Sequence, residues 1–161
     1  MQSITPCLWF DGQALEAAEF YTSLFPGSSM GEAHQTKSDT PGGKANSVML
    51  VTFTLAGRTY QALNGGPHYK FNEAISLSVS CDDQVEVDHF WERLTADGGK
   101  PGKCGWLKDK YGLSWQIVPK ALGQFLGGPD PVKAKRAMHA MLQMSKLDIA
   151  ALQRAYEDDP S

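Results

Sequence analysis

The chain has 161 residues, of which 42% are hydrophobic and 20% charged, as in an ordinary soluble globular protein. Its formal net charge of −3 offers no general electrostatic attraction to nucleic acid or to an anionic lipid surface. No apolar run approaches the roughly 20 residues that a membrane span needs, and the N-terminal sequence lacks the pattern of a secretory signal. The widely spaced Cys7, Cys81 and Cys104 favour reduced thiols. We therefore expect a cytoplasmic protein that binds neither nucleic acid nor membrane.

The first predicted elements are a strand within residues 4–10 (ITPCLWF) and a helix that follows it. Asp11 is the predicted N-cap of this helix, and Pro26-Gly27 ends it. One helical face carries the apolar residues at i, i+3, i+4 and i+7: Ala17, Phe20, Tyr21 and Leu24. This face predicts packing on a sheet.

Two strands, residues 47–55 and 58–64, follow a loop over residues 36–46 (TKSDTPGGKAN), which we expect to be mobile. A two-residue turn at Ala56-Gly57 would place Thr52 opposite Gln61, on the face of the sheet that points away from the helix. The connector NGGPHYKFNE, which contains His68, then leads into the second half of the chain.

The second half repeats this design. In residues 74–81 (AISLSVSC) apolar and small residues alternate strictly, as in a strand with one buried face. Asp83 and Glu86 have the spacing of a capping box, and the next helix repeats the earlier apolar face with Val87, Phe90, Trp91 and Leu94. A strand and an amphipathic helix that occur twice indicate two copies of one module.

The second module is shortened, because only residues 100–119 remain for its other strands. A four-residue turn over Asp109–Gly112 would place Trp106 across from Trp115, so that both tryptophans lie beneath the helix. Asp109 is then a turn residue that forms local hydrogen bonds. Gln116 faces the other way, on the side that carries Ser76 and Ser78.

Residues 129–161 predict a hairpin of two helices. Asp130-Pro131 starts the first, and Ser145 with Asp148 starts the second. Such a hairpin must dock on something. It packs against its own sheet module, or it covers a dimer seam or a cavity; we favour the dimer seam.

The order of elements, together with FYTSLFPGS, YQALNGGPHYKFNEAISLSV and DKYGLSWQIVP, resembles the vicinal-oxygen-chelate superfamily. That superfamily includes glyoxalase I, extradiol dioxygenases and the bleomycin and fosfomycin resistance proteins. The PhnB-like branch, often labelled demethylubiquinone methyltransferase-like, is the most similar, over about Ser3–Pro119. The resemblance implies an α+β fold of paired βαβββ modules, a cavity bounded by the curved sheets, and a homodimer. We thus expect one domain at 1–128, with modules at about 1–66 and 73–120, and a helical extension at 129–161.

Metal-using members of the superfamily take ligands from the first and last strands of each module. The resemblance maps these positions onto Pro6, Gln61, Ala74 and Gln116. Proline and alanine cannot ligate through their side chains, and neutral amides are poor substitutes for imidazole and carboxylate. We predict no metal ligands and no cofactor, and a divalent metal is the less favoured alternative. No glycine-rich G-x-G turn opens a helix, so the methyltransferase label has no support from a nucleotide-type motif.

The hypothesis is a protein that binds a small molecule in a cavity. Its candidate substrate-binding residues are Gln61, Gln116, Ser76, Ser78 and His68. No catalytic residue can be assigned, because no general base or activated nucleophile is recognisable. Three alternatives stay open: a sequestering dimer without catalysis, a metal-dependent lyase or dioxygenase, and a structural dimer with a vestigial cavity.

Overall fold

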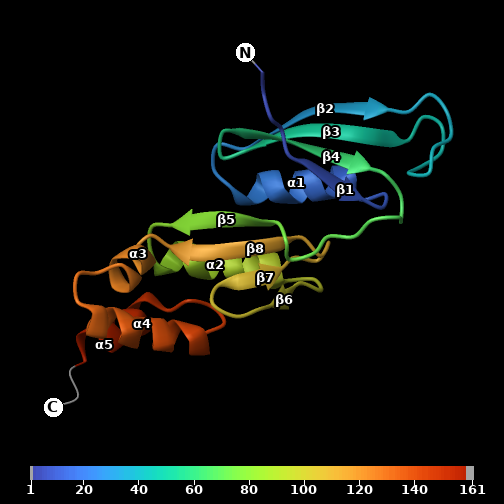
Figure 1. The fold of residues 1–161 in the computed structure, drawn as a ribbon. Coiled ribbons are helices and arrows are strands. Elements are labelled where there is room, and N and C mark those ends of the chain that lie inside the picture. The colour runs from blue at the N-terminus through green and yellow to red at the C-terminus, as the bar shows by residue number, and fades with distance from the viewer. Residues whose placement is uncertain (1, 159–161) are drawn as a thin grey trace. The chain divides into compact units, whose positions relative to one another are not determined.

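The computed structural model describes residues 2–158 of the chain. The chain divides between Phe71 and Asn72, within the predicted connector, into two compact units, which we call the first and the second unit. Each unit contains a four-stranded sheet and a helix that packs against one face of it (Figure 1). None of the helices in residues 2–158 has the length and apolar character needed to cross a membrane.

The first unit has five elements: β1 (Cys7–Phe10), α1 (Ala14–Leu24), β2 (Ser29–Gln35), β3 (Val48–Leu55) and β4 (Arg58–Asn64). The strand order is β1-β4-β3-β2, with β1 parallel to β4 and the other pairs antiparallel. The predicted hairpin is confirmed: Thr52 pairs with Gln61 across the turn at Ala56-Gly57.

The core of the first unit lies between α1 and the sheet. Tyr21 of α1 is fully buried, and its ring lies 6.5 Å from that of Phe53, which is 1% exposed. Val51 and Ala62 are also fully buried on this face. The alternation of side chains along β3 and β4 therefore turns Thr52 and Gln61 away from α1.

The predicted N-cap of α1 is wrong. Gln13 holds the N-cap position without a capping bond from its own side chain, and Asp11 lies outside the helix. The N–H of Ala14 instead donates to Oδ1 of Asn64 at 2.9 Å, and Nδ2 of Asn64 donates to the carbonyl of Val48 at 2.9 Å. The buried amide of Asn64, at the end of β4, thus accepts the hydrogen bond from the first turn of α1 that the side chain of a local N-cap would otherwise accept.

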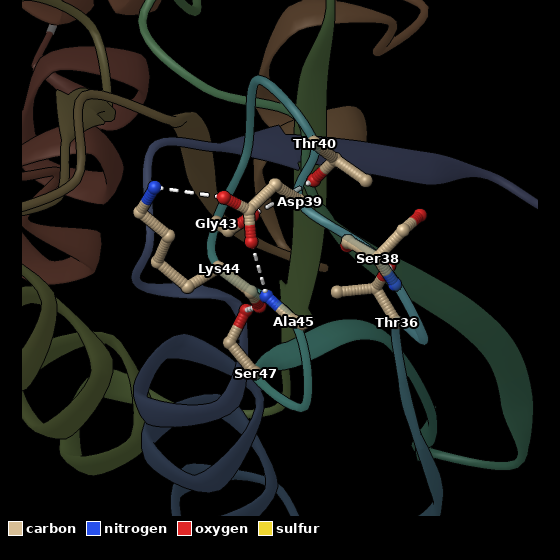
Figure 2. Close-up of polar contacts among 8 residues, drawn as sticks. All are labelled: Thr36, Ser38, Asp39, Thr40, Gly43, Lys44, Ala45 and Ser47. Carbon is tan, nitrogen blue, oxygen red and sulfur yellow. Dashed lines mark hydrogen bonds and ion pairs between the residues drawn. The ribbon is translucent and has the colours of Figure 1, made fainter.

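The loop between β2 and β3 forms its own network of polar contacts (Figure 2). Asp39 accepts a hydrogen bond from Nζ of Lys44 at 2.8 Å and from the N–H of Ala45 at 2.9 Å. These contacts, with Lys44 first, lower the pKa of the Asp39 carboxyl. The N–H of Thr36 donates to the carbonyl of Ser47, which closes the loop at its base.

The second unit repeats the order of the first. Its elements are β5 (Ser76–Cys81), α2 (Gln84–Thr95), β6 (Lys100–Pro101), β7 (Trp106–Lys108), β8 (Ser114–Pro119), α3 (Leu122–Leu126), α4 (Pro131–Gln143) and α5 (Ile149–Glu157). The strand order β5-β8-β7-β6 matches that of the first sheet element for element. The paired βαβββ modules are therefore confirmed, and β6, with two residues, shows where the second module is shortened.

The capping box of α2 is confirmed in its main contact. The Asp83 side chain accepts from the N–H of Glu86 at 2.9 Å, whereas the Glu86 carboxylate accepts from the N–H of Asp82 at 2.7 Å. The predicted apolar face of α2 is buried over its whole length and consists of Val87, Phe90, Trp91 and Leu94.

The predicted pairing of the two tryptophans is wrong. Trp106 pairs with Gln116, and Leu107 pairs with Trp115, because the β7–β8 ladder closes at Lys108 and Ser114. The register is thus shifted by one residue from that of the expected four-residue turn. Trp115 is 2% exposed and faces α2, whereas Trp106 is only partly buried and lies on the opposite face with Gln116.

The C-terminal helices dock on the second unit of their own chain. Gln84, at the start of α2, donates to the carbonyl of Leu147 at 3.1 Å and accepts from the N–H of Ile149 at 2.9 Å. Nζ of Lys146 lies 2.7 Å from the carboxylate of Asp88. Within one chain, these contacts show that the helices pack against their own sheet module, the first of the predicted alternatives. Asp148 caps α5. The separation of residues 129–161 as an extension stays a prediction.

Candidate functional site

Each sheet has a face that points away from its helix, which we call the helix-distal face. In the first unit this face carries Gln61, between Cys7 of β1 and Thr52 of β3. Trp9 and Leu63 form the next pair along the same face. Partial burial raises the pKa of the Cys7 thiol above its ordinary value. The face therefore presents an amide beside apolar and aromatic surface.

The connector holds Trp9 from one side. Nε1 of Trp9 donates to the carbonyl of Gly66 at 2.9 Å, and the ring of Tyr69 meets the indole edge-on at 4.9 Å between centroids. Tyr69 is nevertheless 68% exposed. His68 lies in the turn between these two connector residues and is exposed, outside the strands that carry Gln61.

In the second unit, the helix-distal face brings three predicted residues together. Gln116 lies between Ser78 of β5 and Trp106 of β7. Nε2 of Gln116 donates to Oγ of Ser76 at 2.9 Å, which fixes the orientation of the amide. Trp106 is the residue that the sequence reasoning missed on this face, because the expected turn assigned it to the core.

A second row of residues lies beside Gln116. Ser114 pairs with Ser76 on one side and with Lys108 on the other. Nζ of Lys108 forms an ion pair with Glu73 at 2.5 Å, and this contact is the main reason that the pKa of Glu73 is lowered. Ser114 is 1% exposed, and its hydroxyl has no hydrogen-bond partner among the residues that the structure describes. A buried hydroxyl of this kind is uncommon in a folded protein.

The two units place their glutamines alike. Gln61 and Gln116 each lie in the strand that pairs in parallel with the first strand of its sheet, and each faces away from the helix. Gln61 and His68 belong to the first unit, whereas Ser76, Ser78 and Gln116 belong to the second. Gln61 therefore lies on the sheet face of the first unit, and the other three strand residues lie on that of the second, whereas His68 lies in the connector.

The positions onto which the resemblance maps metal ligands do not fit a divalent ion. The neighbour of Gln61 across the ladder is Cys7, and that of Gln116 is Ser78. Pro6 contributes only its backbone carbonyl, which accepts from the N–H of Gln61 at 2.9 Å. Apart from the Cys7 thiol, whose pKa is raised, these positions and their neighbours supply no carboxylate, imidazole or thiolate, the side-chain groups that hold such ions. In residues 2–158, no three His, Cys, Asp or Glu side chains gather in a group that could hold a metal.

Comparisons with known proteins identify the family. Residues 2–118 match the family model described as 3-demethylubiquinone-9 3-methyltransferase. A PhnB protein from Bacillus cereus, whose structure carries the same enzyme description, is 35% identical. The match covers 73% of this chain and 99% of that one, with a TM-score of 0.66. No curated protein matches the sequence.

A second solved structure is similar in fold, and a third is matched more weakly. Protein PA1353 from Pseudomonas aeruginosa is 20% identical, with a TM-score of 0.58, over 74% of this chain and 98% of that one. The fosfomycin resistance protein FosX from Listeria monocytogenes is 15% identical, with a TM-score of 0.49, over 74% and 93%; so low a likeness supports no inference. On the family match and the PhnB structure, the chain belongs to the PhnB-like family described as 3-demethylubiquinone-9 3-methyltransferase.

Proposed function

We propose that the protein binds a small organic molecule on the helix-distal face of the second sheet. The observation that carries this proposal is the cross-strand pair of Trp106 and Gln116. An indole that is only partly buried beside an oriented amide offers a flat apolar surface and a directional polar group at one place.

The chemistry of this face favours a planar ring that bears a hydroxyl group. The indole of Trp106 can stack on such a ring. Because Nε2 of Gln116 donates to Ser76, the carbonyl oxygen Oε1 is the part of the amide that can accept a hydrogen bond from the ligand. Ser78, next to Gln116 in the ladder, can donate or accept a further bond.

Gln61 and His68 belong to the first unit and enter the proposal as a separate candidate surface. Gln61 repeats the placement of Gln116, and Trp9 supplies an indole on the same face. We further propose that the protein forms a homodimer, as the resemblance implies. Measurement of its molar mass in solution tests this. No carboxylate pairs with Gln61 or Gln116 in the ladders, where their neighbours are Cys7, Thr52, Ser78 and Trp106, and no general base is assigned. Binding without catalysis is therefore the form of the proposal that we favour.

The direct test is calorimetric titration of the purified full-length protein with naphthol, a planar ring with one hydroxyl donor. We expect saturable binding that Trp106→Leu and Gln116→Leu each weaken by about tenfold, equivalent to about 1.4 kcal/mol. Ser80→Ala is the matched control, because Ser80 lies on the same face at the Val118 row, away from Gln116. Equal binding by all four proteins would refute the proposal.

Catalysis is a separate question with a separate measurement. Incubation with a short-chain demethylubiquinone and S-adenosylmethionine tests the activity that the family description names. The same incubation with added divalent metal ions, and a panel of electrophiles and dioxygenase substrates, tests the chemistry of the wider superfamily. Turnover that Gln116→Leu abolishes would replace the binding-only form of the proposal with an enzymatic one.

A further inference from the structure

The chain continues well beyond the part that the family model matches, which ends at residue 118. The segment after it, residues 120–158 in the structure, contains α3, α4 and α5. We infer that this segment positions Trp106, with Ser145 as the positioning residue. The consequence for ligand binding rests on the proposed function, whereas the placement of the indole does not.

The first step is that the turn before β7 is closed on the backbone of Trp106. The N–H of Gly102 donates to the carbonyl of Trp106 at 2.8 Å, and the N–H of Trp106 donates to the carbonyl of Lys103 at 3.0 Å. Both backbone polar groups of Trp106 are therefore used within this turn. Any movement of the turn moves the start of β7 and the indole with it.

The second step is that the C-terminal segment holds the same turn at three residues, Gly102, Cys104 and Gly105. The hydroxyl of Ser145 donates to the carbonyl of Gly102. The N–H of Cys104 donates to the carbonyl of Met144 at 2.9 Å, and the N–H of Gly105 donates to the carbonyl of Ser145 at 2.8 Å. On its other side, Gly105 accepts from the N–H of Ile117, the residue after Gln116, at 2.8 Å. The turn is thus held by the segment on one side and by β8, which carries Gln116, on the other.

The third step is that the turn needs such support. Cys104 has a φ of 55° and Gly105 a φ of 84°, so two consecutive residues occupy the left-handed region. A residue with a Cβ atom rarely adopts this conformation unless its surroundings fix it. Leu147 is fully buried, and its side chain lies where a Cβ added to Gly105 would come within 3.1 Å. The segment therefore supplies contacts that keep the turn in its strained form.

The segment is itself anchored away from the turn. Gln84 binds the backbone of Leu147 and Ile149 through both ends of its amide, and Lys146 pairs with Asp88. The anchor lies on α2, whereas the held turn lies at the start of β7. This separation allows one contact of the segment to be changed while the other stays.

The experiment uses full-length protein labelled with 5-fluorotryptophan, whose four ¹⁹F resonances are assigned from the single Trp→Phe variants. Ser145→Val lacks the hydroxyl and has nearly the volume of Ser145→Thr, which keeps it, so the two variants form a matched pair. Ser145→Ala serves if the valine variant does not fold. We expect Ser145→Val to shift or broaden the Trp106 resonance and leave those of Trp9, Trp91 and Trp115 in place. Ser145→Thr should keep the wild-type spectrum. Lys146→Met, which alters only the anchor, should do the same.

If the segment had a merely structural role, Ser145→Val would lower the midpoint of unfolding without selectively shifting the Trp106 resonance of the native state. An unchanged Trp106 resonance in folded Ser145→Val, or equal shifts of all four, would therefore overturn the inference. Calorimetric titration of the same variants with naphthol gives the second reading, an expected loss of affinity of roughly tenfold in Ser145→Val. If naphthol fails to bind the wild-type protein while the Trp106 resonance still responds to Ser145→Val, the proposed function fails and the positioning role stands.

Discussion

The indole N–H of Trp115 donates to Oδ2 of Asp109 at 2.9 Å, and each residue is 2% exposed. Oδ1 of the same carboxylate accepts from the N–H groups of Tyr111 and Leu113, at 2.9 and 3.0 Å. One buried carboxylate therefore binds the loop between β7 and β8 to the core. A buried charge is tolerated when hydrogen bonds of this kind stabilise it.

Removal of this carboxylate should cost more than removal of its indole partner. Asp109→Ala leaves three donors without their acceptor, and we expect the free energy of unfolding to fall by about 2–4 kcal/mol. Trp115→Phe removes one donor and part of the ring, with an expected loss of about 1–3 kcal/mol. Urea denaturation followed by circular dichroism measures both. A smaller loss for Asp109→Ala than for Trp115→Phe would contradict the bracing role of the carboxylate.

The register of β7 and β8 predicts unequal roles for the two tryptophans. Trp115→Ala opens a cavity beneath α2, with an expected cost of about 3–5 kcal/mol. Trp106→Ala removes a ring that is only partly buried on the other face, so its cost should stay below about 1.5 kcal/mol. Fluorescence quenching by acrylamide gives an independent reading, because Trp106→Phe should remove more of the quenchable emission than Trp115→Phe. Equal costs of the two alanine variants would favour the pairing of the tryptophans with each other.

The two hairpins show what the sequence can and cannot predict. At Ala56-Gly57 the turn has two residues, so turn length alone fixes the pairing of Thr52 with Gln61. At Asp109 the side chain accepts from the N–H groups of Tyr111 and Leu113, and the ladder pairs Lys108 with Ser114, one residue away from the expected register. A shift of one residue moves every side chain of the strand to the other face, which is why Trp106 was expected in the core.

In the candidate site, too, local patterns predict some contacts, whereas contacts between residues far apart in the sequence could not be predicted. Alternation within β5 and β8 predicts that Ser76, Ser78 and Gln116 share a face, and the Gln116–Ser76 hydrogen bond lies on it. The cap of α1 by Asn64 could not be read from the sequence, because 50 residues separate Asn64 from Ala14. The contacts of Ser145 with the turn before Trp106 span 43 residues to Gly102 and carry no local signal either.

Substitution of two glycines with similar backbone angles distinguishes the cost of backbone strain from the cost of crowding by neighbouring atoms. Gly57 has a φ of 81° and Gly105 a φ of 84°, but a Cβ on Gly57 would meet nothing within 4 Å. A Cβ on Gly105 would lie 2.8 Å from the carbonyl oxygen of Ile117 and 3.1 Å from Leu147. Gly57→Ala should cost about 1–2 kcal/mol, from the left-handed conformation alone. Gly105→Ala should cost clearly more in the same urea titration; equal costs would show that Leu147 does not press on the turn.

Cys7 and Cys81 should differ in their reactivity toward iodoacetamide at pH 8. Burial, with smaller contributions from the charges of Glu86, Asp82 and Asp83, raises the pKa of Cys81 to about 12. The side chain is also fully buried, so neither the thiolate nor access is available. We expect Cys81 to stay unmodified in the native protein while Cys7 reacts, more slowly than a free thiol. Mass spectrometry of the peptides measures both rates, and labelling in guanidinium, where the environments are lost, is the control. Native labelling of Cys81 as fast as Cys7 would contradict its burial.

The ion pair between Asp88 and Lys146 should make the docking of the C-terminal segment sensitive to acid. The hydrogen bond from Lys146, and then that from Gln84, lowers the pKa of Asp88 in the folded protein. As the pH falls, the Asp88 carboxyl therefore takes up its proton in the unfolded chain before it does so in the folded protein. The stabilisation by the ion pair is complete above the ordinary aspartate pKa of about 3.9 and is lost as the pH falls through the lower pKa of the folded state.

Lys146→Met should accordingly lower the free energy of unfolding near pH 7, by no more than about 1 kcal/mol because both side chains are partly exposed. The difference from the wild-type protein should shrink as the pH falls below about 4. Lys135→Met, on an exposed position of α4, controls for the change in net charge. Urea titrations at several pH values measure all three proteins. A difference that is constant with pH, or that grows in acid, would show that the contribution of Lys146 does not come from its pairing with the Asp88 carboxylate.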